Sequence, residues 1–231
     1  MKEQRTLSKG WWISFAVIFV VIVCAIIIFV KPATKDDPGA TGPITTDTAK
    51  TGCDVPARDT SSKPAMPKDL RWQAANGLTW PISDTYGPTQ TKNGFGVCFA
   101  HSPLGAALAA TTIAFSSYGA EGPRKAMEFY LIDSVGKPLA IASSNATASS
   151  SELTSRGLAL AGFSITEYAT DRASVSLVFS SPKVTTGFVA TPVTLVWVNG
   201  DWRWKIPDNG VTDAVSYPVE GGFVKWAGSN G

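Results

Sequence analysis

The chain has 231 residues, a formal net charge of +2, 44% hydrophobic residues and 16% charged residues. This composition is apolar for a soluble protein, and the length leaves room for about one domain of ordinary size beside a membrane segment and a linker. Three Cys and a single His, at spacings that match no metal motif, exclude a zinc site of the usual kind.

An uncharged apolar block occupies residues 11–30. A helix needs roughly 20 apolar residues to cross the hydrocarbon core of a bilayer, so the block fits one crossing. Trp11 and Trp12 stand at one end, where amphipathic rings favour the headgroup region. The block therefore predicts a single transmembrane helix near the N-terminus.

This apolar block fits neither type of processed leader. A cleaved signal peptide has an apolar core of about 7–15 residues and a small-x-small cleavage site, whereas Lys31-Pro32 follows this longer block. A lipoprotein needs a small residue just before a modifiable Cys, but Cys24 follows Val23 deep inside the block. We therefore expect an uncleaved signal anchor.

The cations that flank the block set its expected orientation. Three precede it and two follow it, namely Lys2, Arg5 and Lys9 before and Lys31 and Lys35 after. Because cytoplasmic flanks carry the excess of Lys and Arg, residues 1–10 should form a cytoplasmic tail. The chain is then expected to be a single-pass protein of the cell membrane with an extracytoplasmic C-terminal domain.

Residues 31–69 are expected to form a linker. Six prolines lie there among Thr, Asp, Lys, Ala and Gly, and large apolar residues are almost missing. Such a stretch cannot bury enough surface to offset its ordering entropy, and proline keeps it extended. The folded domain is predicted over residues 70–231.

Cys53 in the linker and Cys98 in a predicted strand are the two cysteines outside the apolar block. In an oxidising compartment they would form one disulfide that ties the linker to the domain. Alternatively they are two unpaired thiols, with Cys98 a small buried hydrophobe. The sequence leaves both alternatives open.

The predicted domain is electrically balanced, with eleven Lys and Arg against eleven Asp and Glu from residue 70 onward. A domain that binds duplex nucleic acid normally carries a basic excess. We therefore expect no direct contact with nucleic acid.

The first half of the domain contains the predicted helices. Residues 70–93 are expected to be irregular, and residues 94–100 to form a strand. Ser102-Pro103 is a helix N-cap followed by proline at the first helical position, and it predicts a helix over residues 104–118 that Gly119 ends. The other expected features are core anchors at Trp72, Trp80 and Tyr86, a second helix from Gly122-Pro123 to about Asp133, and a weak third helix around residues 151–160.

The last third of the domain alternates with the period of strands. Strands are expected over residues 162–169, 173–179, 188–198 and 202–206, and Asn199-Gly200-Asp201 marks a tight turn. Trp202, Trp204 and Ile206 share one face of the last strand. Helices followed by a four-strand antiparallel meander predict an α+β fold in which a curved sheet wraps over two to three helices.

The strand–turn–strand of residues 193–204, preceded by residues 163–168 and 173–179, resembles the NTF2-like superfamily of cone-shaped α+β domains. With the single anchor and linker, the chain resembles the VirB8/TcpC group of conjugative type IV secretion systems. The motif of residues 94–110 is similar to one seen in proteins of actinobacterial mobile elements.

This resemblance implies a non-enzymatic, bitopic membrane scaffold of a conjugative transfer apparatus. Its implied partners are other subunits of the apparatus and further copies of itself, and it implies no cofactor, metal or catalytic residue. Mce-associated membrane proteins share the same anchor-plus-domain plan. They imply the alternative of a ligand-binding or enzymatic NTF2-like envelope protein.

His101 is the only histidine of the chain and directly precedes the predicted N-cap. Enzymes of NTF2-like fold use a His/Asp pair, and here Asp133 or Asp171 would have to approach in space. A lone His is usually structural or solvated, and catalysis needs a base and a substrate pocket in the right geometry. We therefore expect no catalytic role for it.

Three other features have a structural and a functional interpretation. Trp202 and Trp204 would line a ligand pocket or, as we expect, fill the core of a hairpin. The Gly/Ala face of the helix over residues 104–118 favours internal packing over a partner-helix interface. Asn145-Ala-Thr147 matches a glycosylation sequon, which we expect to be accidental.

Overall fold

The computed structural model describes residues 53–56, 59–144, 150–211 and 216–228. The predicted anchor over residues 11–30 and the first part of the predicted linker lie outside these residues. Within the described ranges, no helix is long and apolar enough to cross a membrane.

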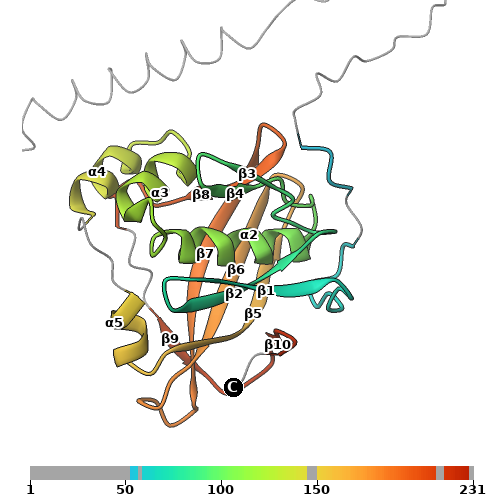
Figure 1. The fold of residues 1–231 in the computed structure, drawn as a ribbon, viewed down its shortest axis with the longest axis vertical. Helices are drawn as coiled ribbons and strands as arrows, with labels where there is room; N and C mark the ends of the chain where they lie inside the picture. Colours follow the sequence, from blue (N-terminus) through green and yellow to red (C-terminus); the bar gives the residue numbers. More distant parts are fainter. Residues whose placement is uncertain (1–52, 57–58, 145–149, 212–215, 229–231) are drawn as a thin grey trace, which may run out of the picture. The chain divides into compact units, whose positions relative to one another are not determined.

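The domain is α+β, as the sequence predicts, and its main sheet is antiparallel (Figure 1). The strands run in the order β10-β5-β6-β7-β8, and β9 also pairs with β7. The predicted meander of four consecutive strands is therefore confirmed. Its strands are β5 (Ala159–Tyr168), β6 (Arg172–Ser180), β7 (Phe188–Val198) and β8 (Asp201–Lys205), joined by β9 (Tyr217–Val219) and β10 (Val224–Lys225).

The β7–β8 hairpin closes on the predicted turn. Asn199 and Gly200 both have positive φ, 53° and 79°, which is the conformation that favours Asn-Gly in a two-residue hairpin turn. Pro192 lies in the middle of β7, between the residues that pair with β9 and those that pair with β8. The missing proline N–H therefore falls in the stretch of this edge that neither short strand covers.

Helix α2 (Pro103–Ser116) crosses one face of the sheet (Figure 1). Almost every residue in it is buried, because its many small side chains let strands and helices approach on all sides. Ser102 is the N-cap, and its hydroxyl accepts a hydrogen bond of 3.1 Å from the Gly105 amide. The helix ends at Ser116, before the expected glycine, because the chain there changes to i→i+3 bonds, from the Tyr118 amide to the Phe115 carbonyl and from the Gly119 amide to the Ser116 carbonyl.

The prediction of irregular structure over residues 70–93 is wrong. That stretch forms the hairpin of β1 (Leu70–Ala75) with β2 (Leu78–Ser83), and β3 (Gln90–Lys92), which pairs with β4 (Phe95–Val97). Both hairpins turn on Asn-Gly pairs, Asn76-Gly77 and Asn93-Gly94, whose four φ values are positive. The expected anchors hold, because Trp80 is buried in the core and Trp72 and Tyr86 pack against it.

Three shorter helices complete the described domain. They are α3 (Gly122–Tyr130), α4 (Gly136–Ser143) and α5 (Ser150–Ser155), of which the sequence did not predict α4. α3 and α4 lie together in Figure 1 and form a small apolar cluster with the end of β8, made of Met127, Leu131, Ala140 and Ile206. The main core lies between α2 and the sheet, where Trp202, Leu177 and Leu195 are essentially fully buried. Burial of each such side chain contributes about 1.5–3 kcal/mol.

Candidate functional site

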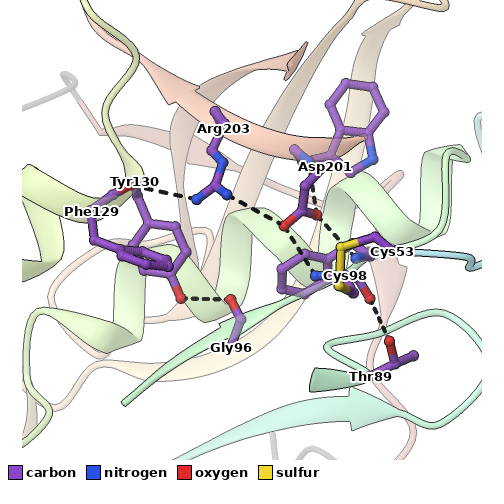
Figure 2. Close-up of polar contacts among 10 residues, drawn as sticks. Cys53, Thr89, Gly96, Cys98, Phe129, Tyr130, Asp201 and Arg203 are labelled. Carbon is purple, nitrogen blue, oxygen red and sulfur yellow. Dashed lines mark hydrogen bonds and ion pairs between the residues drawn. A yellow bond between two sulfur atoms is a disulfide. The ribbon is translucent and has the colours of Figure 1, made fainter. Parts of the chain in front are cut away.

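Asp201 is a buried carboxylate between the sheet and the start of α2, with only 2% of its surface exposed. Oδ2 accepts the Cys98 amide at 3.0 Å, and Oδ1 accepts the amides of Phe99 and Trp202, each at 3.0 Å (Figure 2). An isolated buried carboxylate would be very costly, and charge-assisted hydrogen bonds offset that cost. Asp201 therefore joins β8 to the segment between β4 and α2.

The local backbone explains why the successive amides of Cys98 and Phe99 both donate to the Asp201 carboxylate. Cys98 follows β4 in the left-handed region, with φ of 67°, so the chain leaves the β3–β4 ladder at this residue. Its carbonyl accepts hydrogen bonds from the Thr89 amide at 3.2 Å and the Thr89 hydroxyl at 3.1 Å. Consecutive N–H groups in such a turn form a concavity suited to an anion, and here the anion is the side chain of Asp201.

Cys53 and Cys98 form a disulfide, which decides between the two alternatives that the sequence left open (Figure 2). The bond spans a sequence separation of 45 residues. It attaches the described part of the predicted linker to the residue whose amide binds Asp201. We call the group formed by Cys53, Cys98, Phe99 and Asp201 the Asp201 junction.

Arg203 and Tyr130 flank the Asp201 junction (Figure 2). The Arg203 guanidinium lies 3.9 Å from Asp201 Oδ2 and 5.2 Å from the centre of the Phe129 ring. Tyr130 donates its hydroxyl to the Gly96 carbonyl at 2.9 Å. These contacts connect β8 with α3 and β4.

Burial controls the protonation of both acidic groups at the site. It raises the pKa of the Asp201 carboxyl, and the Phe99 and Cys98 amides and Arg203 oppose this only in part. Burial also raises the pKa of the Tyr130 hydroxyl, with a further contribution from the charge of Asp201. Tyr130 therefore stays protonated and acts as a hydrogen-bond donor.

His101 stacks on Trp197, with ring centres 4.0 Å apart and an angle of 4° between the planes, and it meets the edge of Trp202. Its Nε2 contacts the Thr170 carbonyl oxygen. A carbonyl oxygen only accepts, so Nε2 must carry the proton. The imidazole is thus held by two indole rings and a backbone group.

Within the described part of the domain, neither of the acidic residues that the resemblance offers to His101 bonds to it. The Asp133 carboxylate pairs with Lys137 at 3.0 Å. Asp171 is exposed, and its backbone carbonyl accepts the Trp197 amide at 2.8 Å. Across the described residues, neither carboxylate has a hydrogen bond or ion pair to His101. The structure therefore does not bring the proposed His/Asp pair together.

The remaining candidates occupy structural positions. Trp202 is fully buried and donates its indole N–H to the Ala100 carbonyl at 3.0 Å, and Trp204 is partly buried against both apolar clusters. The Gly/Ala face of α2 packs inside the domain. The sequon Asn145-Ala-Thr147 lies outside the described residues. Nor do the described residues group three or more His, Cys, Asp or Glu side chains as metal ligands.

A further acidic residue, Asp59, was not singled out by the sequence. Both of its carboxylate oxygens are buried, and neither makes a hydrogen bond of normal geometry to the described residues. Burial raises the pKa of the Asp59 carboxyl, while the Ser102 hydroxyl and the Ser61 and Leu104 amides lie near enough to lower it in part. The carboxylate is thus held beside the N-terminus of α2.

The segment that carries Asp59 belongs structurally to the domain. We call residues 53–56 and 59–69 the strap. Besides Cys53 and Asp59, Pro64 is buried and Met66 packs against the main core. The covalent bond, the buried carboxylate and the apolar contacts hold the strap at three separate points.

The fold and the site define a class of protein: a small α+β domain whose central helix crosses an antiparallel sheet and whose preceding segment is covalently tied to it. The chain belongs to the family described as a domain of unknown function, DUF8175, whose model matches residues 33–225. The match includes the strap and extends to β10. Neither a curated protein nor a solved structure matches the chain.

Proposed function

We propose that this protein is a single-pass membrane scaffold of a conjugative, type IV secretion-like transfer apparatus, with its α+β domain outside the cytoplasm. The observation that carries the extracytoplasmic placement is the Cys53–Cys98 disulfide. Disulfides persist in oxidising compartments and are rare in the cytosol. Together with the apolar block of residues 11–30, this supports an anchored domain on the outer side of the membrane.

A scaffold role, rather than catalysis, is supported by how the polar groups of the site are used. The Asp201 carboxylate is bound by three backbone amides, and His101 is clamped between Trp197 and a backbone carbonyl. General acid–base catalysis needs a group within reach of a substrate proton. These side chains instead fix the fold around α2.

The position of α2 across the β5–β8 meander supports assignment of the domain to the NTF2-like cones. In this proposal the sheet curves around the helix, and α3 and α4 close one end. The contacts with other subunits are then made by the outer surface.

An exposed apolar patch supports binding to other proteins. Val135, Leu139 and Val211 are 70%, 50% and 52% exposed. Their chain neighbours pack together, because a Cβ added to Gly210, next to Val211, would lie 2.4 Å from the Leu139 Cβ, and one added to Gly136, next to Val135, would lie 3.3 Å from the Gly210 nitrogen. Apolar side chains gathered on a surface favour protein contacts. We propose that this patch, on α4 and the segments beside it, binds another subunit of the apparatus.

Transfer frequency in a deletion strain tests the proposal. Deletion should lower transfer, the full chain should restore it, and a Val135→Asp/Leu139→Asp variant should not. A Gln73→Asp/Thr185→Asp variant adds the same charges at exposed positions away from the patch and should restore transfer. Unchanged transfer after deletion would show that the protein is not part of the apparatus.

The alternative is a ligand-binding envelope protein of the Mce-associated type, and a cavity between the β1–β2 hairpin, the end of α2 and α5 favours it. Gene neighbourhood separates the two proposals. Adjacent genes for conjugation ATPases support the scaffold, whereas genes of an Mce operon support the ligand-binding alternative.

A further inference from the structure

A cavity of about 340 Å³ lies between the β1–β2 hairpin, the end of α2, α5 and the adjoining ends of β5 and β6. Small-molecule pockets in proteins have volumes of about 300–1,000 Å³, so the cavity is large enough for one small group or chain segment. Its large apolar wall residues include Trp72, Leu78, Phe115, Leu153, Leu160 and Phe179.

The wall of this cavity carries no charge among the described residues that line it. Two of its three polar side chains have partners inside the protein, because the Trp72 indole N–H donates to the Ala227 carbonyl at 2.9 Å and the Thr154 hydroxyl donates to the Ser151 carbonyl at 3.1 Å. The third, Thr79, is exposed. Burying an ion or an unpartnered polar group there would be costly. The cavity is therefore suited to an uncharged, apolar occupant.

The floor of the cavity lies in the main core, and its mouth is open. Phe115 stacks on Trp80 at 5.8 Å and on Phe179 at 6.3 Å, so the floor is part of an aromatic row in the main core. Thr79 and Ala159, which also line the cavity, are exposed. A ligand can therefore place an apolar end inside while a polar end stays in water.

We propose that this cavity binds the hydrocarbon chain of a lipid-class ligand, with the headgroup outside. The neutral apolar wall accepts the chain and excludes a charged head. The volume near the lower end of the range for ligand pockets fits one chain segment rather than a whole diacyl lipid. The chain can come from a free fatty acid or from a phospholipid, and the inference stands whether or not the protein belongs to a transfer apparatus.

Photo-crosslinking of the full-length protein in phosphatidylcholine vesicles tests this inference. One arm contains a phosphatidylcholine with a diazirine near the end of one acyl chain, and the other contains a fatty acid with the same group. We expect labelled peptides from residues 70–79 and 150–160 in at least one arm, and the arm identifies the source. Labelling confined to residues 11–30 in both arms would overturn the proposal.

Two substitutions make the test specific. Ala159→Trp fills the mouth from an exposed position and should lower labelling of these peptides about tenfold. Ala74→Trp, at an exposed alanine of β1 outside the cavity, is the control and should leave the labelling unchanged. Leu153→Asp places a charge on the wall from α5 and should also lower labelling, which keeps the test valid if Ala159→Trp unfolds. Unchanged labelling in a folded Ala159→Trp or Leu153→Asp variant would refute the inference.

Discussion

At the scale of single residues, Asp201 links two parts of the domain that are far apart in the sequence. It begins β8, yet its carboxylate is bound by the amides of Cys98 and Phe99, about a hundred positions earlier in the chain. Each of these bonds joins the meander to the residues that lead into α2. Replacing this one side chain should therefore destabilise the contact between the two halves of the domain.

Replacing this carboxylate by an amide tests that influence. Asp201→Asn keeps the size of the side chain but turns an NH₂ group toward at least one backbone N–H. An unpaired buried group costs about 1–3 kcal/mol, and we expect the free energy of unfolding to fall by that amount in urea denaturation. Asp208→Asn, at an exposed position after β8, is the control and should leave it unchanged.

Asp59 gives a prediction with a defined pH dependence. Burial raises the pKa of its carboxyl above the ordinary value of 3.8, so the folded state binds the proton more tightly than the unfolded state. This carboxyl therefore destabilises the folded state increasingly as the pH rises from 3.8 through the folded-state pKa, and the effect is complete above it.

Asp59→Asn removes this titration. At pH 7 the variant should unfold at a higher urea concentration than the wild type, and the gap should shrink as the pH falls below the folded-state pKa. Asp54→Asn, at an exposed residue of the strap, serves as the matched control. A lower stability of Asp59→Asn at pH 7 would mean that the charge of this carboxylate stabilises the N-terminus of α2.

At the scale of secondary structure, α2 depends on small residues because neighbours surround it on every side. A Cβ added to Gly105 would lie 2.0 Å from the Ala100 carbonyl oxygen. This contact involves backbone, which cannot swing aside as a side chain can. Glycine is therefore required here for close approach, in the first turn after the Ser102 cap.

Gly105→Ala should destabilise the domain although alanine is the better helix former. The intrinsic gain of about 1 kcal/mol is smaller than the cost of overpacking, about 1–3 kcal/mol plus the loss of the cap bond. Thermal unfolding should show a lower Tm. Gly221→Ala has open space around its Cβ and should be tolerated, so an equal loss in both variants would contradict the argument.

The elements that the sequence predicts well are those with a clear period. β6 and β7 alternate, and α2 has both a Ser-Pro start and continuous apolar character. The first two hairpins were missed because no residue of β1 or β3 is buried, and because β2, although mostly buried, contains Pro81, which argues against a strand. The Asn76-Gly77 and Asn93-Gly94 turns were nevertheless visible. α4 was missed because Gly136 and Pro138 are poor helix formers, and tertiary packing with α3 stabilises it instead.

The site was far less predictable than the fold. Cys53 and Cys98 were recognised as a pair, but spacing alone does not distinguish a disulfide from two thiols. The sequence identifies Asp201 only as a turn residue. Its partners are backbone amides, and no sequence motif predicts which amides a carboxylate will bind. The position of Asp59 depends on how the strap folds back, which a proline-rich composition does not reveal.

At the scale of the whole molecule, the disulfide makes the strap part of the domain. In the chain-entropy model, a closed loop of this length stabilises the folded state by about 4 kcal/mol, because it restricts the unfolded chain between Cys53 and Cys98. The other strap contacts lie further along the chain, at Asp59, Pro64 and Met66, and at Asp69, whose carboxylate accepts the Ser83 hydroxyl and the Thr85 amide. The bond therefore holds the N-terminal end of the strap.

Cys53→Ser/Cys98→Ser should lower the free energy of unfolding by about 4 kcal/mol, and reducing the wild type should have the same effect. Limited proteolysis should then cleave within residues 53–63 before it cleaves the sheet. Cys24→Ser, in the apolar block, is the control and should match the oxidised wild type. If the strap stays as protected after reduction as before, its other contacts suffice to hold it.

The Cys53–Cys98 bond also changes the path by which a pull on the N-terminal side reaches the domain. Tension applied through residue 52 enters at Cys98, next to the buried carboxylate and one turn ahead of α2, and bypasses both early hairpins. The bond also shortens the tether between the predicted span and the domain to roughly 22 residues, with a reach of at most about 70–80 Å. Reduction would lengthen the tether and direct the load into β1.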